Sequence, residues 1–172
     1  GNVAQYSVEK AMALGAKVVT VSDSSGTVVD ESGFTPEKLA ELMEVKNHLY
    51  GRVSDYAKRV GAAFHPGLRP WHVPVDVALP CATQNEVDGE DARMLVKNGV
   101  ICVAEGANMP STADAVKVFE GNGVLYAPGK ASNAGGVATS GLEMSQNAMR
   151  LSWRRDEVDA RLTEIDAEMT PL

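Results

Sequence analysis

Cysteine, positive charge and long apolar runs are all scarce in this chain of 172 residues. It has two cysteines, Cys81 and Cys102, with no C-x-x-C pair, so the sequence indicates neither a disulfide framework nor a zinc site. Its three histidines (His48, His65 and His72) show no metal-ligand spacing. The 16 lysines and arginines are outnumbered by 23 acids. The resulting net charge of −7 argues against non-specific binding to nucleic acid or to an anionic membrane.

The remaining composition is that of one globular domain. Hydrophobic residues make up 44% of the chain and charged residues 23%, which is ordinary for a protein with a real core. No apolar run approaches the ~20 residues needed to span a bilayer, and no signal or transit peptide is visible. We therefore expect a cytoplasmic protein without a membrane partner or a bound metal.

Helical and extended patterns alternate along the chain. This alternation predicts an α/β fold, with a Rossmann-like, mostly parallel sheet and helices on both of its faces. Runs rich in β-branched or apolar residues predict strands at 17–22, 75–79, 100–104 and 124–127. Apolar residues at helical spacing predict helices near 4–15, 35–47, 53–60, 88–97, 111–120 and 132–149, and a final helix, marked by Val158, Leu162 and Ile165, that reaches the chain end.

The first four residues, Gly1-Asn2-Val3-Ala4, match the second half of a G-x-G-x-x-A dinucleotide-binding turn. An ordinary helix start capped by Asn2 would explain these four residues alone. The order that follows favours the nucleotide turn, because Asp23 ends the next strand about 20 residues later, where this fold places the acid that binds the adenosine ribose. Gly1, Asn2 and Val3 would then bind the pyrophosphate at a helix N-terminus. On this interpretation the first strand of the sheet is missing from the chain.

Four loops that follow predicted strands are rich in small and amide-bearing residues. A single loop of this kind is explained by turn geometry. Ligands of open α/β sheets bind outside the carboxyl ends of the strands, so the four together predict one continuous ligand crevice. The loops read SDSSG at 22–26, PCATQNE at 80–86, EGANMP at 105–110 and PGKASNAGG at 128–136.

Five stretches, in this order along the chain, resemble the nucleotide-binding C-terminal half of the small hexameric, NADP-dependent glutamate dehydrogenases: GNVAQY, SDSSG, LPCATQNE, AEGANMP and GKASNAGGVATSGLEMSQN. The resemblance implies reversible oxidative deamination of L-glutamate to 2-oxoglutarate and ammonia, and a homohexameric parent. It also implies that residues 1–150 form the dinucleotide-binding domain. Residues 151–172 would form a helical segment that leads back toward an absent substrate domain.

The resemblance assigns roles to residues of three loops. Amide side chains suit a nicotinamide, because they donate and accept hydrogen bonds without adding charge, so Asn108 is the candidate for the carboxamide on both grounds. Ala82, Thr83 and Gln84 would lie near the nicotinamide ribose. Positions that face the substrate in the family correspond to Asn133, Val137 and Ser140, and Ser140 would bind a substrate carboxylate. The catalytic lysine and aspartate of the family would lie outside this chain, so we expect no catalytic residue in it and no activity from it alone.

The choice between NADP and NAD rests on few residues. Asp23 alone favours NAD, because a carboxylate accepts from the ribose 2′-hydroxyl and repels a 2′-phosphate. Ser24 and Lys46 favour NADP, since they can donate to a phosphate. Many members of the family carry an arginine shortly after this lysine, but this chain has Asn-His-Leu at 47–49 and Arg52 as its next basic residue. We expect NADP, with NAD possible.

Three other functions stay open at this point. The nearest alternative is an NAD-dependent branched-chain or aromatic amino-acid dehydrogenase, whose substrate pocket would be apolar. A non-catalytic nucleotide-sensing module would keep the glycine turn without needing the NAGG loop. A Rossmann-type methyltransferase would keep Asp23 but has no use for paired amide loops. Cys81 and Lys130 lie in these loops, and we interpret them as a packed wall residue and a solvated charge.

Overall fold

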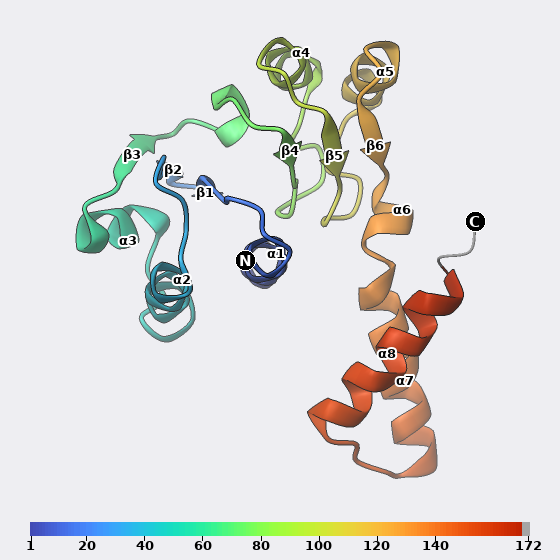
Figure 1. Ribbon diagram of the computed structural model, residues 1–172. Helices are drawn as coiled ribbons and strands as arrows, with labels where there is room; N and C mark the ends of the chain where they lie inside the picture. Colours follow the sequence, from blue (N-terminus) through green and yellow to red (C-terminus); the bar gives the residue numbers. More distant parts are fainter. Residues whose placement is uncertain (170–172) are drawn as a thin grey trace.

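The computed structural model describes residues 1–169, which fold as an α/β structure with two three-stranded sheets (Figure 1). The first sheet is antiparallel, in the order β1 (Thr20–Asp23), β2 (Gly26–Val29) and β3 (Ala63–Pro66). The second sheet is parallel, in the order β4 (Val77–Ala78), β5 (Cys102–Ala104) and β6 (Leu125–Ala127).

The helices lie close to the predicted ranges, although the helix predicted at 132–149 begins at Ala134 and is preceded by the short helix α6. Thr35 caps its helix by accepting from the Lys38 amide, and Asp88 accepts from the first-turn amides of the next long helix. The helices are α1 (Asn2–Ala13), α2 (Pro36–Met43) with the π-helix η1 (Glu44–His48), α3 (Val53–Val60), the short 3₁₀-helix η2 (Pro70–His72), α4 (Gly89–Lys97), α5 (Ala113–Gly121), α6 (Gly129–Ser132), α7 (Ala134–Met149) and α8 (Arg155–Met169).

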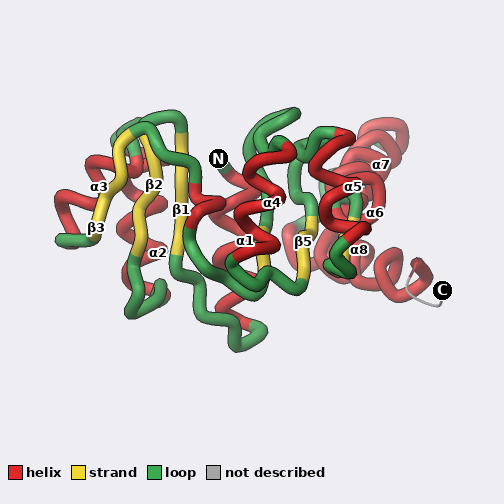
Figure 2. Tube along the Cα trace, turned by 90° about the horizontal axis from the view of Figure 1, so that it is seen from above, coloured by secondary structure: helices red, strands yellow, loops and turns green. Residues whose placement is uncertain are grey.

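Each sheet has its own apolar core. Helices α1, α2 and α3 pack with the antiparallel sheet around Val28 and Tyr56, which are fully buried. Helices α4 and α5 pack on the parallel sheet around Val103 and Phe119, also fully buried. Both views place α1 between β1 and the parallel sheet (Figure 1 and Figure 2), so the glycine turn lies where the two halves meet.

The α/β fold class is confirmed, and three of the four predicted strands form the expected parallel sheet as β4, β5 and β6. The placement of the strand predicted at 17–22 beside them was wrong. It is present as β1, but it pairs antiparallel with β2. The reason is the SDSSG loop, which is a tight hairpin turn that pairs Asp23 with Gly26. A Cβ on Gly26, whose φ is +142°, would collide with the His65 carbonyl oxygen, so this turn needs glycine.

The C-terminal helices lie apart from both sheets. Helix α8 packs along α7, and no residue of α7 is buried (Figure 1). The division at residue 150 stays a prediction, and residues 170–172 of the predicted C-terminal segment lie outside the described residues. Strands β1 and β4 are edge strands of their sheets. Among residues 1–169 no helix is long and apolar enough to cross a membrane.

Candidate functional site

Asp23, at the end of β1, is an ionised carboxylate whose two oxygens are both occupied by the protein. Oδ1 accepts from the backbone and hydroxyl of Ser25 at 2.8 and 2.6 Å. Oδ2 accepts from Lys46 Nζ at 2.9 Å and from the Val53 amide at 3.0 Å. Burial raises the pKa of Asp23, but these hydrogen bonds outweigh burial and lower it to about 2. The carboxylate therefore holds β1, η1 and α3 together.

Lys46 lies on the π-helix η1, which continues α2 for one wider turn. Its ammonium donates to Asp23 and, at 3.0 Å, to the carbonyl of Gly51. An ammonium has three donors, so one N–H remains for a ligand. The pair of Asp23 and Lys46 carries no net charge.

Ser24 and Arg52 lie beside this pair and are exposed. Arg52 Nη1 donates to Ser24 Oγ at 2.9 Å, which leaves the serine hydroxyl hydrogen free to donate to a ligand. Arg52 is the N-cap residue of α3, and its backbone amide donates to Asp55. From the sequence, Ser24 and Lys46 are predicted to donate to a phosphate, whereas Arg52 is only the next basic residue. Its position directly before a helix was the signal that could have placed it here.

The glycine turn lies next to this charged cluster. Gly1 is the N-cap of α1, and it lines a small cavity together with Ser22, Lys46 and Val53. Asn2 and Val3 are exposed in the first turn of α1. Their position at a helix N-terminus is the one that the sequence predicted for a pyrophosphate site.

A partly buried amide pair joins α1 to η1. Gln5, which is 4% exposed, donates to Asn47 at 3.2 Å and accepts from it at 2.9 Å. Asn47 directly follows Lys46 in the sequence. The pair therefore holds the glycine turn at a set position relative to Lys46, a relation that sequence spacing could not reveal.

On its other side, α1 touches the loops that follow β4 and β5. A Cβ on Gly106 would lie 2.6 Å from the Cys81 sulfur and 3.0 Å from a Val3 methyl carbon. The Ser7 hydroxyl also lies 3.5 Å from the Cys81 sulfur. Burial raises the pKa of the Cys81 thiol, which keeps it protonated and agrees with a packed wall residue. Helix α1 thus lies against both loops, with Val3 next to the loop after β5 and Ser7 next to the loop after β4.

The loop that carries Ala82, Thr83 and Gln84 is exposed, and hydrogen bonds of Glu86 hold it in place. The Glu86 carboxylate accepts from the Ala82 amide at 2.8 Å, and the Glu86 carbonyl accepts from Trp71 Nε1 at 3.1 Å. Three consecutive residues therefore remain free to face a ligand.

The candidate site residues form a polar row that begins at Ser24. Asn108 and Asn133 form a hydrogen bond at the other end of this row. Asn133 Nδ2 donates to Asn108 Oδ1 at 2.8 Å and to the Ala107 carbonyl at 3.2 Å. Asn133 is the N-cap residue of α7, and Val137 and Ser140 follow it four and seven positions later, on the same side of the helix. Both are exposed. The predicted nicotinamide and substrate residues are therefore neighbours.

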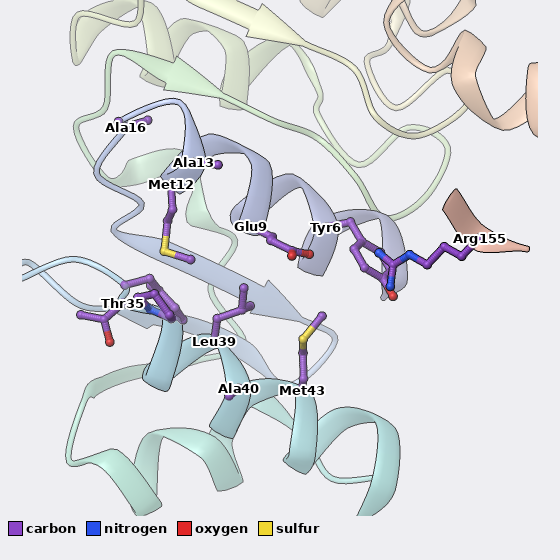
Figure 3. A pocket seen from close by; sticks show the side chains of 13 residues that line it. Tyr6, Glu9, Met12, Ala13, Ala16, Thr35, Leu39, Ala40, Met43 and Arg155 are labelled. Carbon is purple, nitrogen blue, oxygen red and sulfur yellow. The ribbon is translucent and has the colours of Figure 1, made fainter. Parts of the chain in front are cut away.

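A larger groove of about 810 Å³ lies elsewhere, along α1 and α2 (Figure 3). Its walls are mainly apolar, with Met12 and Leu39 facing each other and Arg155 near Tyr6 at one end (Figure 3). None of the residues predicted to bind cofactor or substrate lines it. The candidate site is the polar row described above.

The described residues define a class of protein: a Rossmann-like α/β fold with polar loops at the carboxyl ends of its parallel strands. A model of the glutamate/leucine/phenylalanine/valine dehydrogenase family matches residues 1–171. The chain belongs to this family.

Relatives narrow the resemblance further. The chain is 68% identical over 165 residues to the NADP-specific glutamate dehydrogenase of Salmonella typhimurium, and this match covers 96% of the chain and 37% of the relative. It is 55% identical over 169 residues to an NAD(P)-specific glutamate dehydrogenase of Xylanibacter ruminicola, with 98% and 38% covered. A crystal structure of Plasmodium falciparum glutamate dehydrogenase superimposes with a TM-score of 0.90 at 51% identity, covering 96% of the chain and 36% of that protein. The chain thus spans little more than a third of the length of these relatives.

Proposed function

We propose that this chain forms the cofactor-binding part of an NADP-dependent glutamate dehydrogenase, which catalyses the reversible oxidative deamination of L-glutamate to 2-oxoglutarate and ammonia. The observation that carries the proposal is the arrangement of the predicted residues. They are spread from residue 1 to residue 140, yet a series of contacts joins the elements that carry them: Arg52 with Ser24, Gly1 with Lys46 around a small cavity, Val3 with Gly106, and Asn133 with Asn108. Relatives named NADP-specific glutamate dehydrogenases support the cofactor and the substrate.

The charges at the adenosine end favour NADP. Because Lys46 neutralises Asp23, and because both oxygens of Asp23 are occupied, this acid is a poor acceptor for a ribose 2′-hydroxyl. Arg52 therefore gives the surface beside Ser24 a positive charge. The Arg52 guanidinium and the Ser24 hydroxyl together can donate hydrogen bonds to a phosphate. Arg52 thereby takes the place of the family arginine that the sequence lacks at 47–49.

The nicotinamide end offers neutral amides. Both hydrogens of the Asn133 amide are given to the 105–111 loop, which leaves its oxygen to accept from a ligand. The Asn108 amide nitrogen has no hydrogen bond to protein within residues 1–169, so it can donate to a carboxamide oxygen. These groups fit a nicotinamide, which supplies the hydride acceptor when bound. They orient its ring, while Val137 and Ser140 face the substrate.

We propose that groups outside this chain carry out the proton transfer of the reaction. The residues of the site are amides, hydroxyls, an ion pair and a buried thiol, and none is placed as a general base for the amine of glutamate. We therefore propose that the chain alone is inactive and works with a second, substrate-binding domain. A homohexameric assembly and a cytoplasmic location stay predictions.

A chimeric enzyme tests the proposal. In it, this chain replaces the matching segment of the Salmonella typhimurium relative, and reduction of NADP and NAD is measured with glutamate, leucine, phenylalanine and valine. We expect glutamate-dependent reduction with a preference for NADP. Preference for an apolar amino acid would favour the alternative dehydrogenases. A folded chimera that binds NADP without turnover would favour a sensing module. The 172-residue chain assayed alone should show no turnover.

A further inference from the structure

Glu105 is a buried acid at the end of β5, and the proposed function has no role for it. Glu105 is only 3% exposed. One carboxylate oxygen, Oε1, accepts from the Ser111 amide at 3.2 Å, and the other, Oε2, accepts from the Gly129 amide at 2.8 Å. No ion pair joins it to a lysine, arginine or histidine of residues 1–169. Burying an acid is costly unless hydrogen bonds satisfy it, so the partners of Glu105 indicate what it does here.

The loop that Glu105 begins, residues 105–111, is the middle one of three. On one side, backbone hydrogen bonds hold it to the loop after β4. The Pro80 carbonyl accepts from Gly106 at 2.9 Å and from Ala107 at 3.0 Å, and the Met109 carbonyl accepts from Asn85 at 3.0 Å. This side is therefore held by the main chain, largely independently of side-chain identity.

On the other side the main chain supplies much less. The backbone ladder between β5 and β6 ends with the Glu105 amide donating to the Ala127 carbonyl at 3.0 Å. Beyond that point, side chains join the 105–111 loop to residues 128–133. Glu105 binds the Gly129 amide, and Ser132 Oγ donates to the Glu105 carbonyl at 2.5 Å. The remaining links come from Asn133, which is itself a proposed ligand-binding residue.

We propose that Glu105 is a positioning residue that sets the distance between the nicotinamide loop at 105–111 and the segment 128–133, which directly precedes the proposed substrate-binding helix α7. This inference rests on the proposed function. A carboxylate suits the task because both of its oxygens accept, so it can hold an amide from each loop at once. Glutamine at this position would turn its NH₂ group toward one of the two backbone N–H groups and break that link.

Two neighbours agree with this role. A Cβ on Gly129 would lie 2.7 Å from the Ala107 carbonyl oxygen and 3.4 Å from Glu105 Oε2, so the loops approach as closely as glycine allows. Burial raises the pKa of Tyr126, and so does its hydroxyl hydrogen bond to the Glu105 carboxylate. Glu105 is thus enclosed by residues of both β6 and the segment that follows it.

The test uses the 172-residue chain and two probes: NADPH, and adenosine 2′,5′-bisphosphate, which lacks the nicotinamide end. Glu105→Gln should weaken NADPH binding about tenfold or more and leave the adenosine bisphosphate within about twofold. It should also speed hydrogen exchange at the Gly129 or Ser111 amide. The control, Glu90→Gln, removes an acid whose side chain is 86% exposed and should change neither.

Unchanged NADPH binding, or equal loss for both probes, would overturn the inference. If Glu105→Gln fails to fold, Gly129→Ala strains the same junction and should show the same split between the probes. A wild-type chain that binds neither probe would contradict the proposed function instead. Hydrogen exchange at Gly129 and Ser111 would still decide whether Glu105 holds the two loops.

Discussion

Lys46 donates to Asp23 across 2.9 Å, and the two side chains are only 18% and 12% exposed. This ion pair changes the cofactor preference that Asp23, the acid at the end of β1, would otherwise indicate. An unpaired carboxylate at this position favours NAD. In the proposed function, a neutralised carboxylate leaves Ser24 and Arg52 to determine the preference for NADP or NAD. The pair also affects stability, because it joins the hairpin of β1 and β2 to η1 and α3.

The first prediction concerns acid stability. The pKa of Asp23 is lowered from 3.8 to about 2, so its contribution is complete above pH 3.8 and is lost as the pH falls through about 2. Asp23→Asn should lower the free energy of unfolding at pH 7 by about 1–2 kcal/mol, with solvent screening allowed for. The difference from wild type should shrink between pH 4 and 2 in urea titrations. Asp114→Asn, which removes an acid with an 80% exposed side chain, is the control. A difference that is independent of pH would contradict this account.

The second prediction separates the two basic residues. Arg52→Ala should weaken NADP about 10- to 150-fold in the chimeric enzyme and leave NAD nearly unchanged, because it removes a charged donor to the 2′-phosphate alone. Lys46→Ala should weaken NADP more than NAD as well, and it should also lower the melting temperature, since it leaves Asp23 without its cation.

The control for these variants is Arg59→Ala on the same helix, where the arginine pairs with Glu41 at 2.6 Å. It should leave the ratio of NADP to NAD affinity unchanged. Equal loss of both cofactors in Arg52→Ala would refute the phosphate role of Arg52.

Most helices and the parallel strands could be predicted from the sequence because their signals are local. N-cap residues such as Thr35 and Asp88 mark the starts of helices, and runs of β-branched residues indicate strands. The antiparallel sheet could not be predicted in this way. Strands β2 and β3 have four residues each and are separated by the 33 residues 30–62, so their pairing depends on contacts distant in sequence.

The sequence could name the loops of the candidate site but not the contacts between them. The ligand crevice at these loops stays a prediction, and the structure adds the contact of Asn108 with Asn133. The contacts of Asp23 with Lys46, of Arg52 with Ser24 and of Glu105 with the Gly129 amide join residues that lie 23 to 28 positions apart. Such contacts have no sequence period, so only the fold reveals them.

The third prediction concerns the close approach at Gly106. Gly106→Ala would press a methyl group against the Cys81 sulfur and Val3, and should cost about 1–3 kcal/mol of stability and weaken cofactor binding. Adding Cys81→Ala should recover part of both losses, because it removes the nearer obstacle. Gly121→Ala, where a Cβ meets nothing within 4 Å, is the control and should be close to neutral. No recovery in the double variant would place the strain elsewhere.

The fourth prediction concerns the substrate. Ser140 lies on the same side of α7 as Asn133 and is exposed, as a residue that binds a free carboxylate must be. In the chimeric enzyme, Ser140→Ala should raise the KM for glutamate about 10- to 150-fold, because it removes one hydrogen bond to a charged group. The KM for NADP should hardly change, since the adenosine end lies at the opposite end of the row. Ser145→Ala, further along α7, is the matched control, because its hydroxyl donates within the helix to the Gly141 carbonyl at 2.9 Å. If Ser140→Ala raised both KM values equally, Ser140 would be acting on the shape of the site, and its assignment to the substrate carboxylate would be wrong.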